Sequence, residues 1–102
     1  MINILYIGRH PEILETVVRL LNANEDWFGA GAETDETAMD LFQKINFKIV
    51  LLGCGIEEKS EEKLHAFFQK SNPNCVIVQH YGGGSGLLKN EILTVLESQN
   101  FV

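Results

Sequence analysis

Short runs of apolar residues alternate with longer amphipathic segments along the chain, and this alternation constrains the fold more than any other feature. The runs predict strands at residues 4–7, 27–32, 47–52 and 75–78. Between them, apolar side chains recur every three or four residues, as on helices that pack one face against a sheet. Strands that alternate with helices through short connections predict a parallel sheet with right-handed crossovers. We therefore expect an α/β fold.

Four helices are expected, one after each strand. Their starts are predicted at Pro11, at Thr34 or Asp35 as the capping residue, near Glu57, and at residue 87 after a run of glycines. The side chains expected to face the sheet are Ile13, Leu14, Val17, Val18, Leu20 and Leu21 in the first helix, Ala38, Leu41, Phe42 and Ile45 in the second, and Leu64, Phe67 and Phe68 in the third. The charges at 57–63 are expected to form a solvated helical face, with a docking patch as the alternative.

The composition limits the kinds of partner that the chain can have. At 102 residues and 45% hydrophobic content, residues 1–102 are expected to form a single domain with one modest core. The net charge of −6, with no lysine or arginine cluster, makes nucleic acid and anionic membranes poor partners. A cytoplasmic location is expected, since there is no signal peptide and no apolar run near the roughly 20 residues that span a bilayer. Cys54 and Cys75 are interpreted as small buried thiols.

Three segments resemble response-regulator receiver domains. In 4–11 the two positions where a receiver has acidic residues that hold Mg²⁺ are Gly8 and Arg9. The segment 47–53 is similar to the one that ends in the phospho-acceptor aspartate, and here that position is Gly53. The segment 76–81 looks like the fourth receiver strand, and His80 takes the place of its terminal threonine or serine. The resemblance thus carries over the hydrophobic pattern and the element order without the signature residues.

This resemblance implies a three-layer, flavodoxin-like, open parallel sheet of four strands in the order 2-1-3-4 with four helices. The chain ends about one strand and one helix earlier than a full receiver. Phosphoryl transfer needs carboxylates for the metal and a nucleophile for the phosphoryl group, and Gly8, Arg9 and Gly53 supply neither. The expected function is therefore a non-catalytic pseudo-receiver, a regulatory or scaffold module that binds another protein. We expect no cofactor and no enzymatic activity.

The missing last helix is expected to leave the fourth strand as an exposed apolar edge. Such an edge attracts another chain, and a symmetric homodimer would bury the same patch on both subunits. Val76 and Val78 are the residues expected at this dimer interface. The alternative is that Phe101 and Val102 fold back over the gap.

A binding site is expected at the carboxyl ends of the strands, where open parallel sheets bind their ligands. The residues predicted at this ligand- or partner-binding edge are Arg9, His10, Asp35, Gly53, Cys54, His80 and Tyr81. His10, Cys54 and His80, with Glu33 or Asp35, are suitable ligand types for zinc or copper. They come from separate loops without metal-site spacing, so no metal site is predicted.

A glycine run that leads into the last helix offers a second kind of site. The candidate anion loop consists of Gly82, Gly83, Gly84, Ser85 and Gly86. Glycines permit close backbone approach and helix-start amides attract anions, and the positive charge of Arg9 would complement such a ligand. The alternative function is therefore a protein or enzyme that binds a small anion such as phosphate or a nucleotide. A flexible turn or a dimer contact would explain the same glycines.

Overall fold

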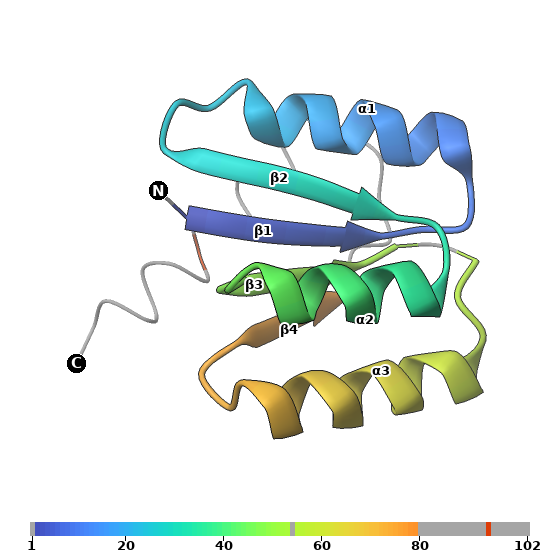
Figure 1. Ribbon diagram of the computed structural model, residues 1–102. Helices are drawn as coiled ribbons and strands as arrows, with labels where there is room; N and C mark the ends of the chain where they lie inside the picture. The colour runs from blue at the N-terminus through green and yellow to red at the C-terminus, as the bar shows by residue number, and fades with distance from the viewer. Residues whose placement is uncertain (1, 54, 80–93, 95–102) are drawn as a thin grey trace.

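The sheet and its helices follow the alternation of the sequence. The structure is a computed structural model, and it describes residues 2–53, 55–79 and 94. The elements are β1 (Ile2–Ile7), α1 (Pro11–Asn22), β2 (Trp27–Ala32), α2 (Asp35–Lys44), β3 (Ile49–Leu52), α3 (Glu58–Ser71) and β4 (Val76–Gln79). All strand pairs are parallel, in the order β2-β1-β3-β4 (Figure 1). The predicted α/β class and strand order are confirmed.

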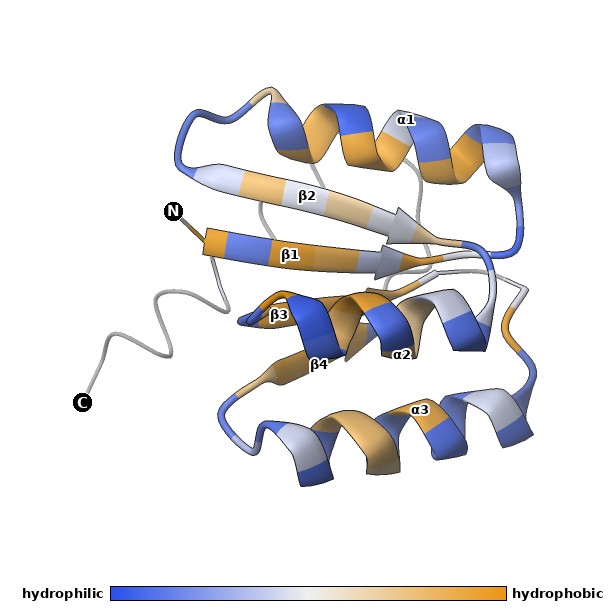
Figure 2. Ribbon diagram, viewed as in Figure 1, coloured by the Kyte–Doolittle hydropathy of each residue, from blue (hydrophilic) through white to orange (hydrophobic). Residues whose placement is uncertain are grey.

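The sheet lies between two layers of helices. α1 lies over β1 and β2 on one face, while α2 and α3 cover the other (Figure 1). Apolar residues follow the strands and the sheet-facing sides of the helices (Figure 2). Two clusters of buried side chains result, one around Leu5, Phe42 and Phe68 and one around Tyr6 and Leu21. The strands β1 and β3 therefore bury side chains on both faces.

The strand bounds differ slightly from the predicted ones. β1 begins at Ile2, β3 begins only at Ile49, and β4 extends from Val76 to Gln79. Phe47 was predicted within the third strand but precedes it, and its ring centroid lies 6.2 Å from that of Phe42 in α2. The Phe47 side chain therefore packs against α2, although the residue does not belong to the strand.

α1 packs closely on β2 because β2 contains two glycines. A Cβ atom at Gly29 would lie 2.6 Å from Leu21 Cβ, and one at Gly31 would lie 2.7 Å from Val18 Cγ2. The prediction that Ile13 belongs to the buried stripe is wrong, since its side chain is 48% exposed. Leu14 packs against Gly31. Ile13 is one residue earlier, which places it about 100° around the helix and away from β2.

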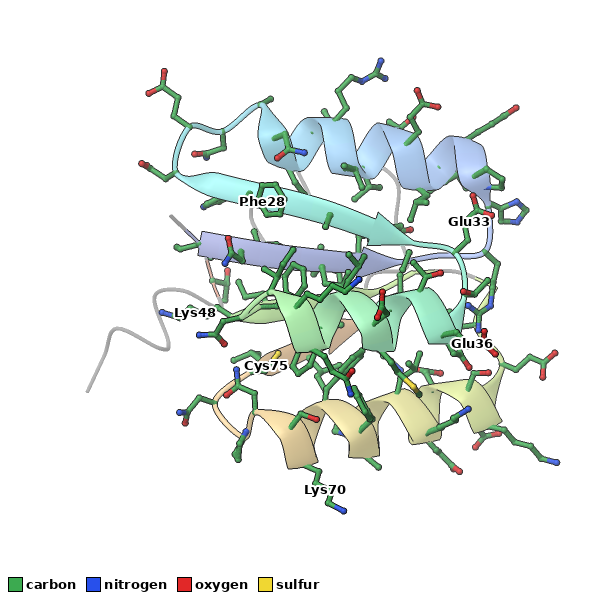
Figure 3. All side chains as sticks on the ribbon, in the orientation of Figure 1. Phe28, Glu33, Glu36, Lys48, Lys70 and Cys75 are labelled. Atoms are coloured by element: carbon green, nitrogen blue, oxygen red, sulfur yellow. The ribbon has the colours of Figure 1, made fainter. Side chains whose placement is uncertain are left out.

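Other local predictions have clear outcomes. Thr34 is the capping residue of α2, because its side-chain oxygen accepts from the Thr37 N–H. Cys75 is buried among the side chains between the sheet and the helices α2 and α3 (Figure 3), and burial raises the pKa of its thiol to about 11. None of the helices described is long and apolar enough to cross a bilayer. Apart from residue 94, the predicted fourth helix at 87–96 lies outside the described residues. The same is true of the glycine run 82–86 and of Cys54, His80, Tyr81, Phe101 and Val102.

Candidate functional site

The carboxyl ends of the central strands form a tightly bonded edge. The Gly8 N–H donates to Ala32 O at 3.0 Å, and the Gly53 N–H donates to Ile7 O at 2.7 Å. Both glycines are buried. The sheet thus remains hydrogen-bonded up to Gly8 and Gly53.

Tyr6 occupies the space beside these two glycines. A Cβ atom at Gly8 would lie 2.8 Å from Tyr6 Cε2, and one at Gly53 would lie 2.6 Å from Tyr6 Cζ and closer still to the hydroxyl oxygen. The Tyr6 side chain is only 2% exposed, so solvent space is not available for it to swing away. Any residue larger than glycine at either position must displace the ring.

The sequence reasoning did not identify Tyr6 as a site residue, although the signal was present. Side chains two residues apart on a strand share a face, so Tyr6 and Gly8 lie on the same side of β1. The register pairs Tyr6 with Leu51, which puts Gly53 at the diagonal position on β3. Alternation together with strand register therefore leads to this contact.

Arg9 links the turn after β1 to the start of α2. Its Nη2 lies 2.6 Å from Asp35 Oδ1, and its Nη1 donates to Glu33 O at 2.6 Å. The Arg9 and Asp35 side chains are 29% and 17% exposed. The guanidinium that the sequence suggested for an anion is therefore already paired with a carboxylate.

The ion pair also shifts the titration of Asp35. Burial raises the pKa of this carboxyl, but hydrogen bonds from Arg9 and Ser60, with the charges of Arg9 and Lys63, outweigh it and hold the pKa below its ordinary value. Ser60 and Lys63 belong to α3. Asp35 is thus a shared acceptor for the turn after β1 and for α3.

The predicted edge residues are only partly brought together. Arg9 and Asp35 are in contact, and Gly53 lies one strand away beside Tyr6. His10 is the exposed capping residue of α1. Gly55 adopts a φ of 88° and packs against Arg9, where a Cβ atom would lie 3.1 Å from Arg9 Cβ. Among the described residues, no group of three or more His, Cys, Asp or Glu side chains is arranged to hold a metal ion.

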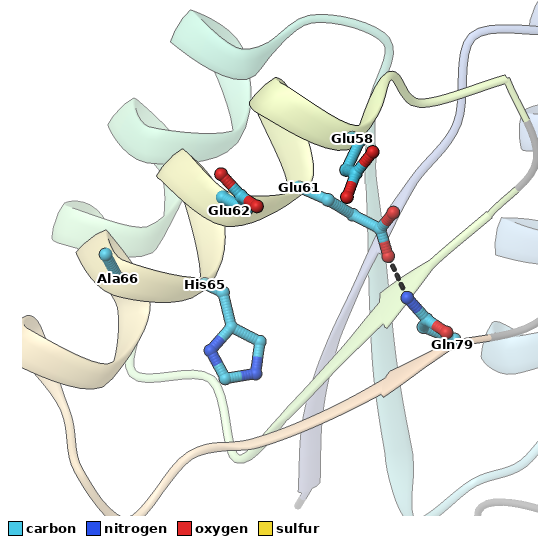
Figure 4. A pocket seen from close by; sticks show the side chains of 6 residues that line it. All are labelled: Glu58, Glu61, Glu62, His65, Ala66 and Gln79. Atoms are coloured by element: carbon cyan, nitrogen blue, oxygen red, sulfur yellow. Dashed lines mark hydrogen bonds between the residues drawn. The ribbon is translucent and has the colours of Figure 1, made fainter.

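A second concave surface lies between α3 and β4. This acidic groove has a volume of about 470 Å³, and its lining residues are Glu58, Glu61, Glu62, His65, Ala66 and Gln79 (Figure 4). The Gln79 amide nitrogen donates to the Glu61 carboxylate, which joins the end of β4 to the first turn of the helix. Of the charged residues at 57–63, which the sequence suggested as a solvated face, Glu58, Glu61 and Glu62 thus line a groove beside the edge strand.

Solved structures share this architecture. The sequence matches no known family model and no curated protein. A response regulator receiver domain protein from Clostridium thermocellum is 20% identical with a TM-score of 0.68, over 95% of this chain and 76% of that one. The receiver domain of NtrC4 from Aquifex aeolicus is 18% identical with a TM-score of 0.65, over 82% of this chain and 69% of that one. The chain has the fold of response-regulator receiver domains.

A third structure extends this likeness to a longer protein. The RcsB response regulator of Salmonella typhimurium is 14% identical with a TM-score of 0.62, over 78% of this chain. The match covers only 41% of the RcsB chain. In this chain the Tyr6 side chain fills the space beside Gly8 and Gly53.

Proposed function

We propose that the chain is a pseudo-receiver, a regulatory or scaffold module that works through protein contacts and not through phosphoryl transfer. The receiver fold supports a signalling role. The glycines at positions 8 and 53 argue against a metal-binding and phosphate-accepting centre, because they provide no carboxylate. A cytoplasmic location, a single domain and the absence of enzymatic activity belong to the same proposal.

The observation that carries this proposal is the position of Tyr6. Its ring and hydroxyl group fill the space that an aspartate at position 53 would need. Arg9 brings a positive charge, paired with Asp35, to a position where the family holds a divalent cation. A filled apolar site beside a fixed cation disfavours both Mg²⁺ and a covalent phosphoryl group.

Incubation with acetyl phosphate and Mg²⁺, followed by mass spectrometry of the intact protein, tests the proposal. We expect no mass increase of one phosphoryl group under conditions that label an authentic receiver domain in the same tube. An acid-labile phosphoryl adduct on this chain would overturn the proposal.

Self-association through β4 is the second part of the proposal, and Val76 and Val78 support it. Both side chains are only partly buried, on the edge strand of the described sheet. If a homodimer uses this strand, Val76→Asp should yield monomers in light scattering, while Ile13→Asp, at an exposed position on α1, should not change the mass. A dimer that persists in Val76→Asp would contradict this interface.

A further inference from the structure

The two edges of the described sheet differ in how their backbone groups are bonded. At the β2 edge, the Asn22 side-chain nitrogen donates to Gly29 O at 3.0 Å, and Asn22 Oδ1 accepts from the Gly29 N–H at 2.9 Å. The Trp27 N–H donates to Asn24 O at 3.2 Å. One side-chain amide thus satisfies both peptide groups of Gly29 at the centre of this edge, so an added strand cannot pair with them.

The β4 edge has no such device at its centre. The Val76 N–H donates to Lys48 O at 2.9 Å, so the peptide groups of Val76 and Val78 face β3. By alternation, the N–H and C=O of Ile77 point away from the sheet. In the stretches 2–53 and 55–79, no residue bonds to these two Ile77 groups. With respect to the described residues, these two groups are therefore available to a strand that pairs with β4.

The two sides of this edge have different chemistry. Toward α3 lies the acidic groove, which brings Glu58, Glu61 and Glu62 to the side of the sheet on which Ile77 packs. Toward α1 lie the side chains of Val76 and Val78, and Val78 packs against the apolar cluster of that face. Side chains of an added strand would alternate between these two environments.

From these contacts we propose that the β4 edge binds an extended segment of another protein in which basic and apolar residues alternate. The backbone of the segment pairs with Ile77, its basic side chains enter the acidic groove, and its apolar side chains cover Val76 and Val78. This inference rests on the proposed function and names the chemistry of the partner. The net charge of −6 strengthens the attraction of a basic segment.

A second copy of the chain, the occupant proposed above for self-association, competes for this edge with the basic segment and fits the acidic groove less well. Two β4 strands paired about a twofold axis keep the same face of each sheet on the same side. Both acidic grooves would then face each other across the junction, and their glutamates would repel. A basic strand meets the same groups with opposite charge.

Labelled peptides of about six residues, the usual length of a strand, test the inference with the full chain. One peptide alternates lysine and valine, a second has the same composition with the lysines grouped together, and a third alternates glutamate and valine. Fluorescence anisotropy should show binding of the first peptide, weakened by salt, and about tenfold weaker binding of the other two. Amide hydrogen exchange at Ile77 should slow when the first peptide binds.

Matched charge variants locate the site. Glu58→Lys with Glu62→Lys should weaken binding of the lysine–valine peptide by about tenfold. Glu15→Lys with Glu25→Lys makes the same charge change at exposed positions on and after α1, which do not line the groove. This pair should leave the affinity within about twofold, because salt screens the interaction between separated surface charges. Circular dichroism checks that both variants are folded.

Three results would overturn the inference. Equal affinity for the alternating and grouped peptides would show charge attraction without strand pairing, and equal loss in both pairs of variants would show no defined site. Slow exchange of Ile77 in the free protein would mean that the edge is already occupied, by a second copy if the protection depends on concentration and by the same chain if it does not. Protection that depends on concentration would support the self-association proposed above. None of these results depends on the acetyl phosphate experiment, so the inference and the proposed absence of phosphoryl transfer fail separately.

Discussion

A single tyrosine determines what the carboxyl edge of the sheet can accommodate. The Tyr6 ring packs over Gly8 and Gly53, and the two glycines and the ring are complementary in shape. In the function proposed above, glycines in place of carboxylates and the aromatic ring have the same consequence, since they remove the charge and the room that a metal ion needs. The Tyr6 side chain therefore fills the space beside these two glycines.

Gly53→Ala should destabilise the protein, because the new Cβ atom lies 2.6 Å from Tyr6 Cζ and 3.0 Å from Ile7 O. Overpacking of this kind costs about 1 to 3 kcal/mol in free energy of unfolding. Urea denaturation measures the loss. In a Tyr6→Leu background the same substitution should cost clearly less, and an equal cost in both backgrounds would show that the ring is not the obstacle.

Arg9→Ala should lower the free energy of unfolding near neutral pH by about 1.5 kcal/mol or more, since Asp35 and Glu33 O lose a charged donor. The control is Lys44→Ala, whose ion pair with Asp40 is 68% and 60% exposed and is expected to contribute about 0.5 kcal/mol or less. Urea denaturation of both variants at pH 7 measures the difference.

The pH dependence of the Arg9→Ala effect has a definite sign. The folded-state pKa of Asp35 lies below its ordinary value of 3.8, so the ion pair stabilises the fold above that pH and loses its effect as pH falls through the folded-state pKa. The difference between wild type and Arg9→Ala should therefore shrink between pH 7 and about pH 2. A difference that stays constant would mean that Arg9 acts through packing and its hydrogen bond to Glu33 O, and not through the Asp35 carboxylate.

At the scale of elements, α1 and β2 form a unit held by glycines and one asparagine. Gly29 and Gly31 let the helix approach, and Asn22 at the last turn of α1 bonds both peptide groups of Gly29. The weak strand propensity of β2 is thus offset by contacts that only glycine permits. The opposite edge strand, β4, has no corresponding asparagine among the described residues.

Asn22→Ala should cost about 1 to 3 kcal/mol, because it removes two hydrogen bonds and leaves the buried Gly29 groups without a partner. Exchange of the Gly29 amide hydrogen should accelerate at the same time. Gln43→Ala, at an exposed position on α2, should change stability by no more than about 0.5 kcal/mol. Unchanged Gly29 exchange in Asn22→Ala would show that the β2 edge is closed by something else.

At the scale of the whole molecule, the sequence predicted what depends on local pattern. The alternation of apolar runs and amphipathic segments led to the parallel α/β sheet, and the resemblance to receiver domains implied its strand order. The position of Arg9, Asp35 and Gly53 at one edge followed from the parallel sheet. Tyr6 was missed because its contact with Gly53 depends on the register between two strands 45 residues apart in the pairing of Ile7 with Leu52. Local periodicity contains no information about such a register.

Two other differences have the same origin. Ile13 was assigned to the buried stripe because periodicity identifies the apolar side of a helix. Which residues on that side contact the sheet depends on the glycines of β2, against which α1 packs. The acidic groove depends on the placement of α3 beside β4, which a charge pattern on the helix alone does not reveal. The sequence therefore predicted the described helices and strands, but not which of their side chains contact one another.

Titration with Mg²⁺, followed by the amide NMR spectrum, tests the central claim of a filled carboxyl edge most directly. We expect the resonances of Gly8, Arg9 and Gly53 to stay in place at millimolar Mg²⁺, because Tyr6 fills the space and Arg9 supplies the positive charge. Saturable shifts confined to these three residues would show that a metal ion enters the edge, and the account would be contradicted.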